Sequence, residues 1–324
     1  MTTSPPAERQ ATRAITSEEG TRPRNPPRRP RRPPRPRLLL APLTHAQLLV
    51  RGALVMVTVV TLGFVANMVG LSQLQHLISQ QELRSDFSGQ LTAGTAPVSE
   101  GDFAGVLLDD GVPVARIQIP AIGVNEIVVE GTTSGDLAKG PGHRRDSVLP
   151  GQVGTSVILG RATAYGGPFG RIQELPPGET ISVVTGQGES LFKVKGVRYA
   201  GDPMPAAVTP GQSRLVLVSA RGAPYAPSGV VRVDADLVST VQAPGARQTS
   251  FAALPGSQRE LGSDFSTLWA LVFALQFLLL AEAAAAYFWR RVGSAKTWVV
   301  FAPVLLLAGL ITADQITRLL PNLI

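Results

Sequence analysis

The residues best placed to take part in a reaction lie in LVLVSARGAPYAPSGVVRVDADLV, from Leu215 to Val238. This stretch reads as two apolar strands joined by a Gly/Pro-rich loop. Ser219 supplies a hydroxyl, and Arg221 and Arg232 supply cations of the kind that stabilise negative charge in acyl transfer. A serine also needs a general base, and this stretch contains no histidine. Because neighbouring residues of a strand point to opposite faces, Ser219 and Ala220 are expected to face opposite ways.

The rest of the chain offers few reactive groups, because it has no cysteine and three histidines. The absence of cysteine excludes disulfides, thiolate metal ligands and thiol nucleophiles. His45 and His76 stand apart from any pattern of ligands, and His143 is interpreted as structural. The sequence therefore predicts no metal site and no other cofactor.

Composition favours a membrane-attached protein, since 44% of the 324 residues are hydrophobic and 16% are charged. Residues 1–37 contain ten Arg and three Glu, which account for the whole net charge of +7. The remainder is neutral, so a nucleic-acid partner is not expected. Residues 1–47 are predicted to be a disordered, Arg/Pro-rich cytoplasmic tail, with an SH3-like ligand or a lipid-headgroup clamp as alternatives.

Three apolar segments are long enough to predict membrane helices: residues 48–71, 266–289 and 298–316. The first contains 20 uncharged residues and lacks a small-residue cleavage site, so it is expected to be an uncleaved anchor. Basic residues collect on the cytoplasmic side, which places the tail and the basic loop 290–297 inside. The protein is expected in the plasma membrane with three spans, its N-terminus cytoplasmic and residues 317–324 a short extracytoplasmic tail.

Two ionisable residues, Glu282 and Asp314, fall within or near the last two spans. Such residues are costly in a membrane and often functional. Snorkelling of Glu282 and an interfacial position for Asp314 are the structural interpretations, and contact with a partner helix or an ion is the alternative. The run AEAAAA, residues 281–286, allows close approach of another helix, either from a partner or from the same bundle.

Between the first two spans the sequence predicts a stalk at 72–111, a β domain at 112–240 and a linker at 241–265. The β domain alternates apolar and polar residues in short runs separated by Gly and Pro. The runs are PVARIQIP, VNEIVVE, TSVILGR, TISVVTG, SLFKVKGVRYA, RLVLVSA and VVRVDADLV. Many short strands with few helical patterns predict a mainly β barrel or sandwich.

The segment KGPGHRRDSVLPGQVGTSVILGRATAYGGPFGRIQELPPGETISVVTGQGESLFKV, residues 139–194, resembles the central part of sortases, most closely the actinobacterial class E type. The resemblance covers residues 113 to about 238. It implies an eight-stranded β-barrel, flanked here by one N-terminal and two C-terminal transmembrane helices. It also implies a transpeptidase with a Cys nucleophile, a His and an Arg.

This chain departs from the family pattern at all three positions. The family's His position corresponds to Arg161, its Cys position to Ala220 and, counting nine residues further, its Arg position to Gly229. No catalytic residue is therefore predicted. Arg232 is an alternative for the Arg if the loop is counted differently, although its strand parity differs from that of Gly229.

The predicted function is a membrane-anchored sortase-like pseudoenzyme that binds or assembles an extracytoplasmic or membrane partner at the cell envelope. The alternatives are an active transpeptidase or hydrolase with a rearranged site, and a structural spacer. The candidates for a binding groove are Arg161, Tyr165, Ser219, Arg221, Tyr225 and Arg232.

Overall fold

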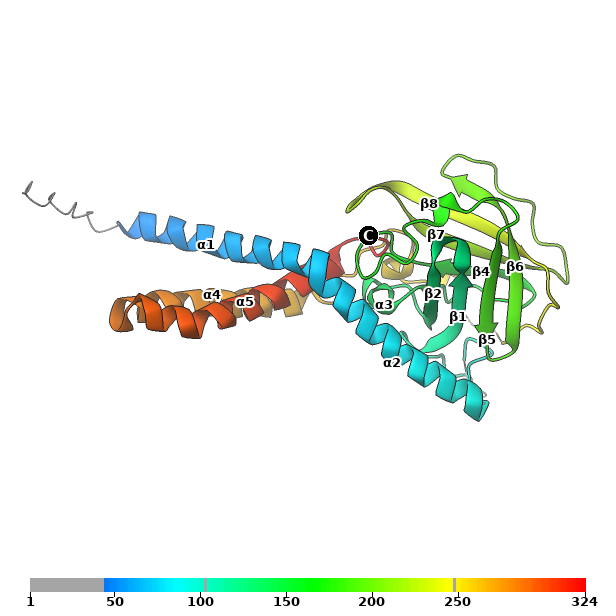
Figure 1. Cartoon of the computed structure of the whole chain (residues 1–324), viewed down its shortest axis with the longest axis horizontal. Coiled ribbons are helices and arrows are strands. Elements are labelled where there is room, and N and C mark those ends of the chain that lie inside the picture. The colour runs from blue at the N-terminus through cyan, green and yellow to red at the C-terminus, as the bar shows by residue number, and fades with distance from the viewer. Residues whose placement is uncertain (1–43, 102–103, 247–248) are drawn as a thin grey trace, which may run out of the picture. The chain divides into compact units, whose positions relative to one another are not determined.

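The computed structural model describes residues 44–101, 104–246 and 249–324, so most of the predicted tail lies outside the described residues. The first described element is a continuous helix of three parts: α1 (His45–Ala66), a π-helical turn (Asn67–Leu71) and α2 (Ser72–Ala93). The helix changes direction at the π turn (Figure 1). A π turn interrupts the regular ladder of α-helical hydrogen bonds, which is a recognised cause of bends.

Helix α2, in the segment 72–111 that is predicted as a stalk, packs on the barrel. Phe87 is buried in a cluster with Ile127 and Val129 of β2 (Val124–Glu130). The Gln80 side chain accepts from the Ile127 amide at 2.7 Å and donates to the Lys139 carbonyl at 2.9 Å. The first part of the predicted stalk therefore forms one side of the domain.

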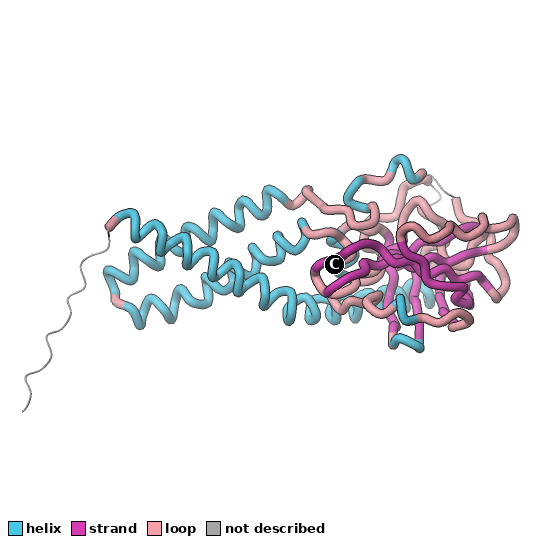
Figure 2. The backbone as a smooth tube through the Cα atoms, turned by 90° about the horizontal axis from the view of Figure 1, so that it is seen from above, coloured by secondary structure: helices cyan, strands magenta, loops and turns pink. Residues whose placement is uncertain are grey.

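Eight strands form a closed barrel in the order β1-β2-β3-β4-β7-β8-β6-β5. This confirms the fold that the sequence predicts. Figure 2 shows the strands packed together at one end of the described chain. The other strands are β1 (Pro113–Ile119), β3 (Gly142–His143), β4 (Gly154–Leu159), β5 (Thr180–Thr185), β6 (Gly188–Tyr199), β7 (Ser213–Ala223) and β8 (Ala226–Leu237). The pairs β2–β3 and β4–β7 are parallel, and the others are antiparallel.

The two-residue strand β3 and helix α3 (Ser134–Lys139) are the elements that alternation alone did not indicate. The Thr133 hydroxyl accepts from the Asp136 amide, and the Asp136 carboxylate accepts from the Thr133 amide. This reciprocal cap satisfies two amides that the first helical turn leaves without partners.

Alternation along β7 divides its side chains between two apolar clusters. Leu215 and Leu217 face the barrel interior with Phe169, Phe192 and Val233. Val216 and Val218 face outward. The outward cluster also contains Leu137 of α3, Val157 and Leu159 of β4, and Leu323. The barrel therefore has a second, outer apolar face, and residues from distant parts of the chain cover it.

Two further helices, α4 (Leu268–Val292) and α5 (Ser294–Leu319), are long and apolar enough to cross a membrane, as is the α1–α2 helix. The basic loop predicted at 290–297 is shorter in the structure, because Gly293 alone separates the two helices. Helix α5 also contacts α1 closely, since a Cβ atom on Gly63 would lie 2.9 Å from backbone atoms of Gly309. Short 3-10 turns occur at Pro120–Ile122, Ile172–Glu174, Phe251–Ala253 and Gly256–Gln258.

Candidate functional site

The outer face where β4, β7 and β8 run side by side brings together two of the three predicted positions. Ala220 of β7 pairs with Val230 of β8, and both pack against the outer apolar cluster. Arg161 follows β4 with the same parity as Val157 and Leu159, which belong to that cluster. The structure therefore brings the predicted His position (Arg161) and Cys position (Ala220) to one face of the barrel.

The strand register corrects the parity argument for the third position. Paired residues of an antiparallel ladder share a face. Gly229 pairs with Arg221, which alternates with Ala220, whereas Arg232 pairs with Val218, whose side chain shares the face of Ala220. Counting residues along the sequence could not show which of the two residues faces this way, because the strand register shifts between Arg221 and Gly222. Arg232, the alternative for the third position, therefore lies on this face, and Gly229 does not.

Arg232 is already engaged in an ion pair. Its guanidinium donates to the carboxylate of Glu260, and the Glu260 carboxylate also lies 3.9 Å from the Arg144 guanidinium. Glu260 comes from the segment predicted as a linker, which here folds back along the barrel. Nothing in the local sequence indicated this partner, because the pairing is set by the path of the linker in three dimensions.

Ser219 faces the barrel interior, as the strand alternation predicts. It is fully buried, and its hydroxyl donates to the Gly160 carbonyl at 2.9 Å. A hydroxyl in this position cannot reach a ligand on the outer face. The structure therefore separates Ser219 from Arg161 and Ala220, which lie on the outer face.

Arg161 is a buried cation, with 1% of its surface exposed. One terminal nitrogen donates to the main-chain oxygen of Ile324 at 2.5 Å, and the other donates to the carbonyl and hydroxyl oxygens of Ser134 at 2.8 Å. The guanidinium also lies over the Tyr165 ring, 4.8 Å from its centroid. Burial lowers the pKa of Arg161 to about 10, so the group still carries its charge at neutral pH.

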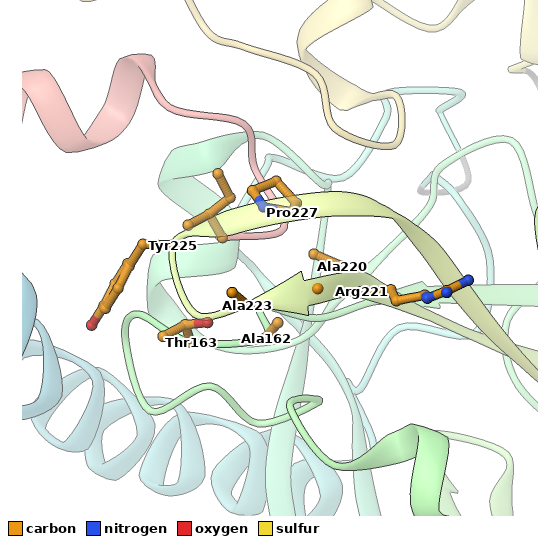
Figure 3. A pocket seen from close by; sticks show the side chains of 9 residues that line it. Ala162, Thr163, Ala220, Arg221, Ala223, Tyr225 and Pro227 are labelled. Carbon is orange, nitrogen blue, oxygen red and sulfur yellow. The ribbon is translucent and has the colours of Figure 1, made fainter.

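The face around Ala220 is filled by the last residues of the chain. Ile324 lines a small pocket together with Ala162, Ala220 and Tyr225. Figure 3 shows Ala162 and Ala220 lying close together there, with Tyr225 at the hairpin tip and Arg221 directed away from it. The cavity volume is about 20 Å³, which is enough for a single water molecule but not for a peptide.

The remaining groove candidates make their contacts elsewhere. Arg221 lies over the Tyr199 ring at 4.8 Å and is exposed. The Tyr225 hydroxyl donates to the Met68 carbonyl in the π turn at 3.2 Å. Tyr165 is buried in a cluster with Met68 and Ala164, and burial raises its pKa. The aromatic residues thus join the barrel to the membrane helices rather than line an open groove.

A buried Ser–His–Glu group lies elsewhere in the barrel, and sequence reasoning did not identify it. His143 Nδ1 is 2.8 Å from the Glu130 carboxylate, while Nε2 is 2.9 Å from the Val148 carbonyl and 3.1 Å from the Ser147 hydroxyl. A carboxylate and a carbonyl are both acceptors, so both ring nitrogens must donate, and the imidazole is protonated. Burial favours the neutral ring, but the charge and hydrogen bond of Glu130 outweigh it and raise the pKa of His143.

This group cannot act as a serine triad. A protonated imidazole accepts no further proton, and the Ser147 hydroxyl donates to the Arg144 carbonyl at 2.7 Å. His143 and Glu130 are 2% and 0% exposed, so substrate has no access. The arrangement agrees with the interpretation of His143 as structural.

The two ionisable residues predicted within or near the last two spans, Asp314 and Glu282, lie on α5 and α4, and Asp314 interacts electrostatically with Tyr165, whose ring lies beneath Arg161. Asp314 accepts from Arg318, one turn later on α5, at 3.2 Å. One carboxylate oxygen of Glu282 is buried without a hydrogen-bond partner among the residues that the structure describes. His76 lies 3.2 Å from Glu126. No group of three potential metal ligands occurs within the described part of the chain.

Comparisons with known proteins agree with this architecture. Residues 117–232 match the sortase domain family. Sortase D of Bacillus subtilis is 33% identical over 78 residues, which are 24% of this chain and 38% of that protein. The chain thus matches well under half the length of this curated relative.

Solved structures of similar proteins include a sortase D5 transpeptidase of Clostridium perfringens, at 18% identity and a TM-score of 0.40. The match covers 51% of this chain and 99% of that one. A mutant of sortase E from Streptomyces avermitilis matches at 25% identity and a TM-score of 0.35, covering 47% and 100% of the two chains. The family match and the closed barrel together make residues 117–232 similar to sortase domains, in a chain with three helices long and apolar enough to span a membrane.

Proposed function

We propose that this protein is a membrane-anchored sortase-like pseudoenzyme that holds an extracytoplasmic or membrane partner at the cell envelope. The N-terminal tail and the junction between α4 and α5 lie in the cytoplasm, and the barrel and residues 320–324 lie outside. The proposed orientation follows from the placement of basic residues near the ends of the spans.

The observation that supports this proposal most directly is the side chain at position 220. The resemblance to sortases assigns the nucleophile to this position, and Ala220 lies there on the outer face beside Arg161. A methyl group forms no acyl intermediate, and the whole chain contains no cysteine that could replace it. We infer that the catalytic step of the family is absent.

The charged groups that remain are suited to binding. Arg161 and Arg232 are held in fixed positions by Ser134 and Glu260 on the outer face, and Arg221, which points away from that face, is exposed on the same strand as Ala220. Guanidinium groups donate several hydrogen bonds in a fixed geometry but do not act as bases at neutral pH. Such groups recognise carbonyl or carboxylate oxygens and leave them chemically unchanged.

The alternative of an active hydrolase needs a serine with a base. Ser219 faces the interior, and the Ser147–His143–Glu130 group is buried and protonated. Incubation of the full-length protein with a serine-reactive fluorophosphonate and with a sorting-signal peptide tests it. We expect neither labelling nor turnover, and either one, if abolished by a serine substitution, contradicts the pseudoenzyme proposal.

The second candidate function, a structural spacer, is favoured by one specific observation. The pocket beside Ala220 has a cavity volume of about 20 Å³, because the chain's own last residues fill the face. In this state the face accepts no partner peptide. A spacer needs no ligand, so the two functions differ in whether the exposed surface around the face contacts another protein.

Crosslinking in native membranes separates the binding function from the spacer. We expect the full-length protein to be crosslinked to a defined partner and Arg221→Glu to reduce that yield strongly, because a reversed charge at a contact is repelled. Lys193→Glu is the matched control, since Lys193 is an exposed cation on β6. Equal yields from both variants and the parent would support the spacer.

A further inference from the structure

Three of the five residues that follow α5 are buried. Asn322 and Leu323 are 0% exposed and Ile324 is 5% exposed. The segment 320–324, called here the plug, turns back on itself, and the Ile324 amide donates to the Pro321 carbonyl at 3.2 Å. Burial of this extent requires specific partners, because the plug contains a polar side chain and several main-chain groups.

The Asn322 side chain is held by main-chain oxygens. Its amide nitrogen donates to the Thr132 carbonyl at 2.7 Å and to the Arg259 carbonyl at 3.0 Å. Its main-chain amide donates to the Gly262 carbonyl at 2.9 Å. Two separate segments of the chain therefore orient one asparagine through its side-chain donor, while its side-chain oxygen has no hydrogen-bond partner among the described residues.

Leu323 fills the outer apolar face of the barrel. Its side chain packs with Leu137 of α3 and with Val157 and Val218 of the strands. Its carbonyl accepts from the Ala162 amide at 2.9 Å. An apolar pocket next to a main-chain donor is a common arrangement in peptide-binding sites, where the donor fixes the backbone and the pocket selects the side chain.

Arg161 completes the site by donating to the main-chain oxygen of Ile324. Among the residues that the structure describes, its hydrogen-bond partners are the oxygens of Ser134 and Ile324. The Arg161 Nε atom is buried without a hydrogen-bond partner in the same region. A buried cation with spare donor capacity favours an oxygen-rich ligand group.

From these contacts we infer that residues 320–324 are an intramolecular ligand, and that they mask a binding site for a short peptide with the same pattern of Pro, Asn and two aliphatic residues. The inference deepens the proposed function and rests on it: the barrel binds its partner only after the plug leaves. The plug is attached directly to α5, so a rearrangement of the membrane helices controls the site. Tethering gives the plug an effective concentration of the order of millimolar or above, which excludes weaker free ligands.

The test uses the full-length protein in detergent and a fluorescent peptide with the sequence of residues 319–324. Leu323→Asp places a carboxylate among aliphatic side chains and should release the plug. We expect the peptide to bind this variant at least about tenfold more tightly than the parent in fluorescence anisotropy. A peptide with the same residues in scrambled order is the control and should not bind.

Two further variants make the result specific. Asn322→Ala removes the side-chain hydrogen bonds without adding charge and should also increase binding, although less. Adding Arg161→Met to Leu323→Asp should remove the gained binding. Equal affinity for parent and Leu323→Asp, binding of the scrambled peptide, or loss of the folded barrel in both plug variants would overturn the inference, because the plug would then be merely part of the core.

The outcome is separable from that of the proposed function. If the peptide fails to bind any variant while Arg221-dependent crosslinking to a partner persists, the masked site is disproved and the binding function stands. If crosslinking fails while Leu323→Asp binds the peptide, the masked site exists and the envelope partner must be sought through it.

Discussion

Single residues decide what the outer face of the barrel can do. Ala220 carries a methyl group where the family resemblance assigns a nucleophile, and Arg232 shares its face because of the strand register. His143, which could have served as a base, is buried and donates both of its ring protons. These residues support the proposal that the outer face binds a partner without acyl transfer.

The His143–Glu130 pair makes stability depend on pH. The pKa of His143 is raised above its usual value of 6.5, so the pair stabilises the fold fully below about pH 6.5. This stabilisation is lost as the pH rises through the folded-state pKa. We expect the unfolding midpoint to decrease from pH 6 to pH 9, measured by circular dichroism in detergent.

The variant His143→Gln provides the comparison for this prediction. It should be less stable than the parent at pH 6, and its midpoint should change less over the same range, because the titrating group is gone. A parent midpoint that is constant over this range, or an equally steep profile for the variant, would contradict the assignment of a protonated imidazole.

At the scale of elements, the helices and the barrel meet at the π turn. The Tyr225 hydroxyl from the β7–β8 hairpin bonds to Met68 there, and Asn67 donates to Thr317 of α5 at 3.2 Å. A π turn leaves its carbonyls differently placed from those of an α-helix, which gives side chains access to them. The bend between α1 and α2 is therefore a junction of three elements (Figure 1).

The α1–α5 contact depends on the absence of side chains at Gly63 and Gly309. A Cβ atom on Gly63 would come within 2.9 Å of the α5 backbone, so Gly63→Leu should separate the helices and cost about 1–3 kcal/mol of unfolding free energy. Gly52→Leu is the matched control on the same helix, because nothing lies within 4 Å of where its Cβ atom would be. Thermal unfolding in detergent measures the stability of both variants. Equal losses of stability in Gly63→Leu and Gly52→Leu would disprove the close contact.

At the scale of the whole molecule, three helices long and apolar enough to span a membrane flank a barrel that the chain itself covers. Segments from both sides of the barrel in the sequence contact it: α2 through Gln80 and Phe87, and the plug through Asn322 and Leu323. The long apolar helices are therefore joined to the barrel both covalently and by packing.

The orientation in the membrane is testable because the chain contains no cysteine. Met204 is 85% exposed on the barrel and Lys296 lies at the α4–α5 junction. We expect a membrane-impermeant maleimide to label Met204→Cys in intact cells and Lys296→Cys only after permeabilisation. The reverse pattern would show that the barrel is cytoplasmic.

The sequence by itself determined the features that are written in local patterns. Alternation of apolar residues predicted seven of the strands, uncharged runs predicted the three long apolar helices, and the absence of cysteine excluded a thiol nucleophile. These features depend on residues that are near one another in the chain, so periodicity and composition reveal them. The short strand β3 was missed because two residues carry no period.

Only the tertiary structure decided which groups share the outer face. Arg161 contacts Ile324 across 163 positions of sequence, Asn322 contacts Thr132 across 190, and Arg232 meets Glu260 from a segment that looked like a linker. No local signal encodes such pairs, because they are set by the closure of the barrel and by the path of α5 back to it. That residues 320–324 cover the outer face of the barrel is for this reason a property of the fold and not of any sequence motif.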